Sequence, residues 1–181
     1  MVSAVTPDFE IVCVNDGSTD ATAEMVTALS QSEPRIKLVN LTRNFGKEVA
    51  LTAGLDFASG DAVIPIDADL QDPPELIPEM IERWREGYDM VIGVRADRRS
   101  DTFLKSATAG AFYRMARWFS DIPIPAHAGD FRLLDRAVVE VLRKFPERSR
   151  FMKGIFAWVG FRQATVRYAR PGRVGGESKW R

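Results

Sequence analysis

The stretch VIPIDADLQDPPE, residues 63–75, carries the pattern that decides the fold. It begins with a short apolar run suited to a buried strand, and three aspartates and a glutamine follow within residues 67–72. Because a charged side chain is costly to bury without a partner, these polar residues are expected beyond the end of the strand. We expect some of these residues to stabilise the fold and others to bind a ligand. The residues that bind a ligand indicate the function.

Similar apolar runs alternate with helical patterns along the chain, which is typical of an α/β protein with a mostly parallel central sheet flanked by helices. We expect strands at 9–14, 36–41, 62–66 and 90–94, and a late strand near 164–168. Helices are predicted at 21–30, 47–58, 73–86 and 102–119, with another beginning near 135. The chain has 181 residues, 45% of them apolar and 28% charged, which suits a single globular domain, 1–181.

The composition excludes several classes of protein. Lysine and arginine together number 25, as do aspartate and glutamate, so no overall field favours nucleic acid. Cys13 is the only cysteine, which excludes an internal disulfide, and its apolar surroundings favour a core position. No stretch reaches the roughly 18 uncharged apolar residues of a membrane-spanning helix, so we expect none in this chain.

The acids of the opening stretch separate into two groups. DPPE, residues 72–75, has the pattern of a capping box at a helix start, which would explain Asp72. Asp67, Asp69 and Gln71 are spaced by two, so they would point the same way if the chain stays extended, at the edge where α/β sheets bind ligands. Their oxygen atoms suit Mg²⁺ or Mn²⁺, although a solvated aspartate-rich loop remains an alternative.

A second polar stretch, VNDGSTD at residues 14–20, also follows a predicted strand. Gly17 permits a tight turn, and residues 18–20 can cap the next helix. Asp16 remains at the strand end, where its carboxylate could accept a hydrogen bond from a nucleobase or a ribose. A role in stabilising the turn itself is the alternative for Asp16.

A third transition from strand to helix lies in LTRNFGKEVALTAGLDFASGD, residues 41–61. Arg43, Asn44 and Lys47 surround Gly46 there. Backbone amides at a helix start attract phosphate, and nearby cations strengthen that attraction. A solvated basic turn is the alternative interpretation.

Together, five motifs resemble the family 2 glycosyltransferases, in particular the polyprenyl-phosphate glycosyltransferases such as dolichyl-phosphate mannose synthase and undecaprenyl-phosphate glucosyltransferase. The motifs are VNDGSTD (14–20), LTRNFGKEVALTAGL (41–55), DADLQDPPE (67–75), GDFRLLDR (129–136) and GGESKW (175–180). The resemblance implies a GT-A, Rossmann-like fold, a nucleotide-sugar donor such as UDP-glucose or GDP-mannose, and inversion at the anomeric carbon. It also implies a polyprenyl phosphate acceptor, Mg²⁺ or Mn²⁺, the cytoplasmic membrane face, and a possible homo-oligomer of the full-length protein.

The resemblance also implies roles for individual residues. It places Asp16, Asp67 and Ala68 at the nucleotide sugar, where Arg43 and Lys47 are also expected. Asp69 and Gln71 would hold the metal, so that Asp69 and Asp130 are the catalytic candidates. Candidates for binding the acceptor or the diphosphate are Arg95, Lys105, Arg173, Ser178 and Lys179.

The expected chemistry is consistent with these side chains. A metal held by Asp69 and Gln71 would neutralise charge that develops on the departing nucleoside diphosphate. A phosphate monoester, with a second pKa of about 6, is already an anionic nucleophile near neutral pH, so Asp130 would position it rather than deprotonate it. A turn acid paired with Arg132 is the alternative for Asp130.

A basic amphipathic segment at residues 98–119 could lie on an anionic lipid surface. An ordinary helix that packs on the sheet fits the same periodicity. The resemblance favours the membrane, because a lipid-linked acceptor must be reached there.

Two other functions are alternatives to sugar transfer. HAD-type phosphatases also end a strand in Asp-x-Asp, but they favour threonine or valine two residues after the second aspartate, where this chain has Gln71. The other alternative is an inactive fragment or a nucleotide-sugar binding module. The resembling family begins with an internal strand for which residues 1–7 are too short, and it continues beyond Arg181, so we expect truncation at both ends and little activity from this chain alone.

Overall fold

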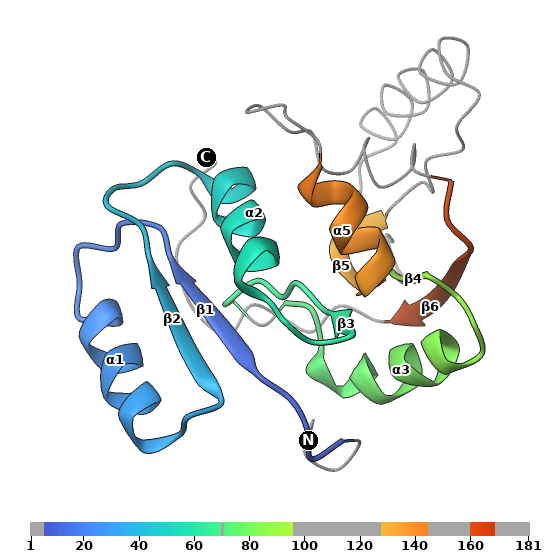
Figure 1. Ribbon diagram of the computed structural model, residues 1–181, viewed down its shortest axis with the longest axis horizontal. Coiled ribbons are helices and arrows are strands. Elements are labelled where there is room, and N and C mark those ends of the chain that lie inside the picture. Colours follow the sequence, from blue (N-terminus) through green and yellow to red (C-terminus); the bar gives the residue numbers. More distant parts are fainter. Residues whose placement is uncertain (1–5, 70, 96–127, 145–159, 169–181) are drawn as a thin grey trace, which may run out of the picture.

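The computed structural model of the chain describes residues 6–69, 71–95, 128–144 and 160–168, with the backbone alone described at 95 and 128–130. These residues form an α/β structure in which two sheets and their helices lie side by side (Figure 1). The α/β class predicted from the sequence is therefore confirmed.

The first sheet contains two parallel strands, β1 (Ile11–Asn15) and β2 (Ile36–Asn40), which pair in register from Ile11–Ile36 to Asn15–Asn40. Parallel neighbours need a crossover, and helix α1 (Thr22–Ser32) supplies it. Asp20 accepts hydrogen bonds from the backbone N–H and the hydroxyl of Thr22, at 3.1 Å and 2.5 Å. Of the three predicted capping residues, Asp20 is thus the one that binds the first residue of the helix.

The second sheet has four strands in the order β3, β5, β4, β6. They are β3 (Ala62–Val63), β4 (Met90–Arg95), β5 (Ala128–Asp135) and β6 (Gln163–Tyr168). Strand β5 runs antiparallel to both of its neighbours, whereas β4 and β6 are parallel. Strands β3, β4 and β6 therefore share one direction and β5 alone runs against them, so the sheet is mostly parallel with one antiparallel strand, which hydrophobic periodicity cannot reveal because it reports burial and not strand direction.

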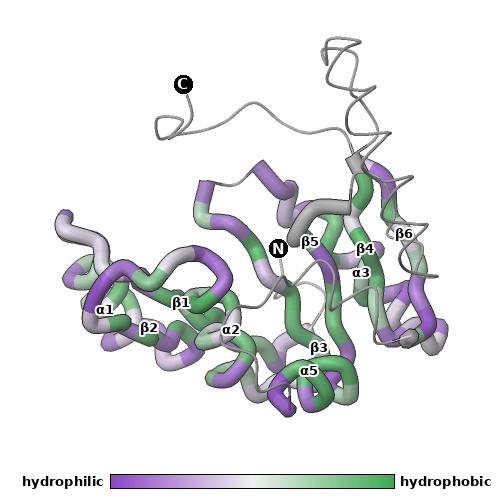
Figure 2. The backbone as a smooth tube through the Cα atoms, turned by 90° about the horizontal axis from the view of Figure 1, so that it is seen from above, coloured by the Kyte–Doolittle hydropathy of each residue, from purple (hydrophilic) through white to green (hydrophobic). Residues whose placement is uncertain are grey.

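The core lies on both faces of the four-stranded sheet. Along β4, Met90 and Ile92 pack on one face with Leu134, while Val91 packs on the other with Phe131. All five are at most 2% exposed. This alternation follows from the period of two in a strand, and burial on both faces explains the consecutive apolar residues 90–92 at the start of β4, a largely hydrophobic strand (Figure 2).

Three helices cover the four-stranded sheet. Helix α3 (Ile77–Arg85), preceded by a short 3₁₀ helix (Pro74–Leu76), packs on one face, and α5 (Arg136–Arg143) packs on the other. Asp135 caps α5 by accepting a hydrogen bond from the backbone N–H of Ala137 at 2.8 Å, as expected for a helix beginning there.

Helix α2 (Lys47–Phe57) connects the two sheets. It packs against β1, where a Cβ on Gly54 would lie 3.3 Å from Val14, and its Leu55 belongs to the core that β4, β5 and α5 share. Because no strand pairing among the described residues joins the two sheets, α2 is a principal physical link between them.

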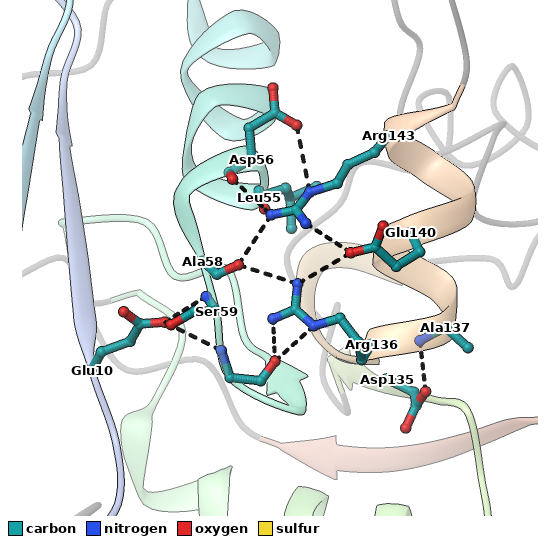
Figure 3. Close-up of polar contacts among 11 residues, drawn as sticks. Glu10, Leu55, Asp56, Ala58, Ser59, Asp135, Arg136, Ala137, Glu140 and Arg143 are labelled. Carbon is teal, nitrogen blue, oxygen red and sulfur yellow. Dashed lines mark hydrogen bonds and ion pairs between the residues drawn. The ribbon is translucent and has the colours of Figure 1, made fainter.

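The last turn of α2 and the residues after it, 55–60, form a joint between two halves of the structure, one containing β1 and the other β5 and α5. Side chains from both halves contact the joint (Figure 3). From α5, Arg143 Nη2 lies within 3.0 Å of three carbonyl oxygens, those of Leu55, Asp56 and Ala58. Arg136 donates to the carbonyls of Ala58 and Gly60. These cations satisfy carbonyls that the end of a helix leaves without intrahelical partners.

The same joint is held from the other half by Glu10, which directly precedes β1. Glu10 Oε1 accepts hydrogen bonds from the backbone N–H groups of Ser59 and Gly60, at 2.6 Å and 3.2 Å, and Lys37 Nζ contacts its second oxygen at 2.5 Å. Burial by itself raises the pKa of Glu10, but the hydrogen bonds from Lys37 and Ser59 outweigh it and lower that pKa to about 2. Glu10 is therefore a firmly ionised anchor between β1 and the joint.

Candidate active site

Asp16 lies directly after β1, at the carboxyl end of the strand, and binds the start of α2. Its two carboxylate oxygens accept hydrogen bonds from the backbone N–H groups of Phe45 and Gly46, at 2.7 Å and 2.9 Å. The loops approach so closely that a Cβ on Gly17 would lie 2.4 Å from the backbone nitrogen of Asn44, which only glycine allows. Asp16 thus sits where the sequence predicts it, and it already anchors the neighbouring loop.

A buried asparagine beside Asp16 fixes this end of the first sheet. Asn15 is 6% exposed, and its amide nitrogen donates to Asn40 Oδ1 at 2.6 Å. Its amide oxygen accepts from the backbone N–H of Ser18 at 3.0 Å, which shapes the turn after β1. Sequence reasoning missed this pair, although an asparagine at the end of both strands was a usable signal.

Lys47, the first residue of α2, reaches across to the loop after β3. Its ammonium contacts Asp67 Oδ2 at 2.7 Å, and the two side chains are 50% and 47% exposed. Nearby, the guanidinium of Arg43 lies 4.7 Å from the centre of the Phe45 ring. The structure therefore brings together four of the five predicted donor-binding residues, Asp16, Arg43, Lys47 and Asp67, around the start of α2.

The loop after β3 contains the proposed metal ligands. Strand β3 ends at Val63, not at 66 as predicted, and Ala68 and Asp69 form a turn. The assumption that the chain stays extended through Gln71 is therefore wrong. Within this loop, Asp69 Oδ1 accepts a hydrogen bond from the backbone N–H of Gln71 at 3.2 Å, which orients the Asp69 carboxylate.

The donor atoms of Asp69 and Gln71 fit a hard divalent cation. A carboxylate and an amide oxygen suit Mg²⁺ or Mn²⁺, which keep several water and phosphate ligands instead of a full protein cage. The described residues contain no group of three or more His, Cys, Asp and Glu side chains able to hold a metal.

Asp72 has a different role from the one predicted. The 3₁₀ helix and α3 both begin without a side-chain cap, so the capping-box interpretation is wrong. Asp72 is 4% exposed, and its Oδ1 accepts a hydrogen bond from the Tyr168 hydroxyl at 2.6 Å. Sequence reasoning missed Tyr168 as the residue that secures this loop, because 96 positions separate the partners.

The remaining predicted site residues are described only in part. Asp130 lies in β5 and not in a turn, and Arg95 ends β4, but their side chains are outside the described residues. Arg132, suggested as a partner for Asp130, is 3% exposed and lies 3.9 Å from the sulfur of Met90. Outside the described residues altogether are Lys105, Arg173, Ser178, Lys179 and segment 98–119. Among the helices that are described, none has the length and apolarity to cross a bilayer.

An α/β fold that collects acids and cations at the carboxyl ends of β1, β2 and β3 belongs to the class of ligand-binding α/β proteins. The family model of glycosyl transferase family 2 matches residues 3–143, and the chain belongs to this family. The family and the GT-A fold predicted from the five motifs are thereby confirmed.

Two relatives show how close the similarity is. An uncharacterized glycosyltransferase of Synechocystis is 55% identical over 172 residues, which are 95% of this chain and 54% of the relative. A bactoprenol glucosyl transferase of Shigella phage SfV is 53% identical over 173 residues, which are 96% of this chain and 56% of the relative. The chain therefore spans about half the length of these relatives.

A solved structure supports the fold. The mannosyltransferase of Pyrobaculum calidifontis, in complex with GDP-Man and Mn²⁺, superposes with a TM-score of 0.60 at 25% identity. The similarity covers 91% of this chain and 49% of that one. Like the two relatives, this glycosyltransferase is considerably longer than the chain.

Proposed function

We propose that this chain provides the catalytic domain of a glycosyltransferase that moves a sugar from a nucleotide sugar to a polyprenyl phosphate, with inversion at the anomeric carbon. The observation that carries the proposal is the 53% identity, over 96% of the chain, to a bactoprenol glucosyl transferase. The donor is a UDP-glucose-like or GDP-mannose-like nucleotide sugar.

The donor binds at the carboxyl ends of the first three strands in this proposal. Asp16 and Asp67 supply carboxylates for the nucleoside, and Ala68, which follows Asp67 at the start of the turn, also contacts the nucleotide sugar in this proposal. The Arg43 guanidinium adds positive charge next to them. Acceptors and cations of this kind match a ligand that carries both N–H and O–H donors and a diphosphate.

The leaving group is handled by Asp69 and Gln71. Mg²⁺ or Mn²⁺ bound to their oxygens would neutralise the charge that develops on the departing diphosphate. The hydrogen bond from the Gln71 backbone N–H to Asp69 Oδ1 holds the carboxylate in its turn, so the ligand atom is already oriented before the donor arrives.

The acceptor phosphate needs positioning more than deprotonation, because it is already anionic near neutral pH. We assign the positioning to Asp130, on β5, and the neutralisation of the two meeting anions to cations. These are Arg95, Lys105, Arg173 and Lys179, with Ser178 beside the last. The reaction would occur at the cytoplasmic face of the cell membrane, on which segment 98–119 lies.

A donor and acceptor screen tests the proposal. The protein is incubated with UDP-glucose or GDP-mannose, with undecaprenyl phosphate in detergent or vesicles, and with Mg²⁺, Mn²⁺ or a chelator. We expect a glycosyl phospholipid in the organic extract that is lost on chelation, and NMR of the product should show the opposite anomeric configuration to the donor.

The screen also separates the alternatives. Donor binding without a lipid product would indicate a nucleotide-sugar binding module or an inactive fragment. Transfer to an acceptor other than a lipid phosphate would refute the proposed acceptor class while leaving the family assignment intact.

A further inference from the structure

The two acids proposed for the nucleoside are both held by consecutive residues at the start of α2. Asp16 accepts from the backbone N–H groups of Phe45 and Gly46, at 2.7 Å and 2.9 Å. Asp67 is held by the ammonium of Lys47 at 2.7 Å. One short segment, residues 45–47, thus contacts carboxylates that follow two different strands.

These contacts help to fix the distance between Asp16 and Asp67, because no strand pairing among the described residues fixes it. Asp16 follows β1, which pairs with β2, whereas Asp67 follows β3, which pairs with β5. Within the described ranges no backbone ladder joins the two sheets, so the start of α2 connects the acids directly (Figure 1).

The contacts also change the role expected for Lys47. A cation beside a helix start is a natural phosphate ligand. Here the N–H groups of residues 45 and 46 are already bound to the carboxylate of Asp16, which weakens the attraction of this helix end for another anion. The ammonium of Lys47 is likewise engaged with a carboxylate.

We propose that Lys47 is a positioning residue that acts through Asp67. It holds that carboxylate at the start of α2, which Asp16 anchors from the other side, so that both acids face the same nucleoside. Lys47 therefore supports binding of the nucleoside and not of the diphosphate. The inference rests on the proposed function, because the nucleotide sugar is the ligand.

The test compares ligands that share a nucleoside and differ in phosphate number. Dissociation constants of uridine, UMP and UDP, and of guanosine, GMP and GDP, are measured for the wild type and for Lys47→Met, and the base that the wild type prefers is used. We expect K47M to weaken all three members of that series by the same factor, about twofold to fivefold, as for an exposed ion pair. A direct phosphate contact would instead leave the nucleoside unaffected and give a loss that grows from the monophosphate to the diphosphate.

Matched variants isolate the contact. Lys47→Arg keeps the charge and should retain most of the affinity. In an Asp67→Asn background, K47M should have a clearly smaller effect than in the wild type, because the contact between the two residues is already weakened. Lys37→Met removes an equally exposed lysine, 50% for each side chain, whose carboxylate partner is Glu10, and it should leave nucleotide affinity unchanged.

Each result of these measurements supports or overturns the proposed role of Lys47. Equal losses across the series that shrink in the D67N background support the inference, and losses that stay as large there overturn it. Losses that grow with phosphate number, or no loss at all, overturn it while leaving donor binding intact. If the wild type bound neither nucleotide series, the proposed donor function would fail and the inference with it. Thermal melting of K47M and of Lys47→Gln is followed in parallel, and loss of folding in both would show a structural role and overturn the inference.

Discussion

The two ends of helix α2 use charge in opposite ways. At the C-terminal end of α2, in the joint of residues 55–60, the Arg143 and Glu10 side chains are 27% and 18% exposed. Each of them makes several hydrogen bonds to backbone atoms. At its start, Lys47 and Asp67 are about half exposed and contact each other. Shielded charges with several fixed partners stabilise a fold, whereas a half-exposed carboxylate keeps part of its surface accessible to a ligand.

This difference suggests that the two ends of α2 have different roles. The end of α2 fastens the half that contains β1 to the half that contains β5, and the start of α2 presents the candidate site. Substitutions at the site end should therefore change activity with little effect on stability. Substitutions at the joint should do the reverse.

The largest effect is expected at Asp69. Asp69→Ala removes the carboxylate proposed to hold the metal, and we expect transfer to fall by about 10²-fold or more because charge on the leaving diphosphate is no longer neutralised. Metal-dependent donor binding should be lost as well, while the melting temperature stays close to that of the wild type. Product formation and calorimetric titration with donor and Mn²⁺ provide the measurements. Full metal-dependent activity in D69A would remove Asp69 from the site.

The next effect is on stability, at the joint. Arg143→Met keeps the aliphatic stem but removes the donor to the carbonyls of Leu55, Asp56 and Ala58, and we expect a loss of about 1.5–3 kcal/mol in the free energy of unfolding. Urea denaturation measures this loss. Arg83→Met is the matched control, since Arg83 pairs with Glu86 on the surface and should cost little. Equal costs for the two variants would contradict the special role of the joint.

The pH dependence of stability tests the other anchor of the joint. Because the pKa of Glu10 lies at about 2, below its ordinary value of 4.5, Glu10 stabilises the fold above pH 4.5 and loses this contribution as the pH falls toward 2. Solvent exposure of part of the side chain reduces the contribution to about 1–2 kcal/mol. The Glu10→Gln variant should therefore be less stable than the wild type at pH 7, and the difference should shrink on acidification.

Glu33 supplies the control for Glu10. Hydrogen bonds from Arg35 lower the pKa of Glu33 to about 2 as well, but the two residues are neighbours on the surface. Glu33→Gln should leave the denaturation midpoint nearly unchanged at both pH values. A gap between E10Q and the wild type that widened on acidification would contradict the assigned role of Glu10.

Features carried by local patterns could be predicted from the sequence. Apolar runs located β1, β2, β4 and β6, and Asp135 was expected at a helix start, which its bond to Ala137 confirms. Strand β5 was missed because Gly129, Asp130 and Arg132 resemble a turn, yet Arg132 is buried in the sheet. The charge of Arg132 argues against a buried strand when the sequence is considered alone, because burial of that guanidinium depends on neighbours far away in the sequence.

The same distinction between local patterns and distant partners applies to the candidate site. The motifs predicted Asp16, Lys47, Asp67 and Asp69 as candidate residues, since their charged side chains are visible in the sequence. Their partners could not be predicted, because a backbone N–H such as that of Gly46 leaves no trace in the residue types. The helix start at Gly46 was expected, but not that a carboxylate from another strand would occupy it.

The smallest effect on donor affinity is expected at the buried bond between Tyr168 and Asp72. Asp72 lies three residues beyond Asp69, but it is 4% exposed and accepts from the Tyr168 hydroxyl at 2.6 Å, so it resembles the joint more than the site. Tyr168→Phe keeps the ring that packs edge to face on Phe131, at 5.9 Å between centres, and removes the hydroxyl. We expect a loss of about 1.5–3 kcal/mol in the free energy of unfolding, because one hydrogen bond to a buried carboxylate disappears while the packing stays. Donor affinity, measured in the same preparation, should change by less than about twofold, since the turn that holds Asp69 is bonded locally to Gln71. If Y168F weakened metal-dependent donor binding tenfold while its stability stayed unchanged, the buried bond would belong to the site, and the division between the two ends of α2 would not extend to this loop.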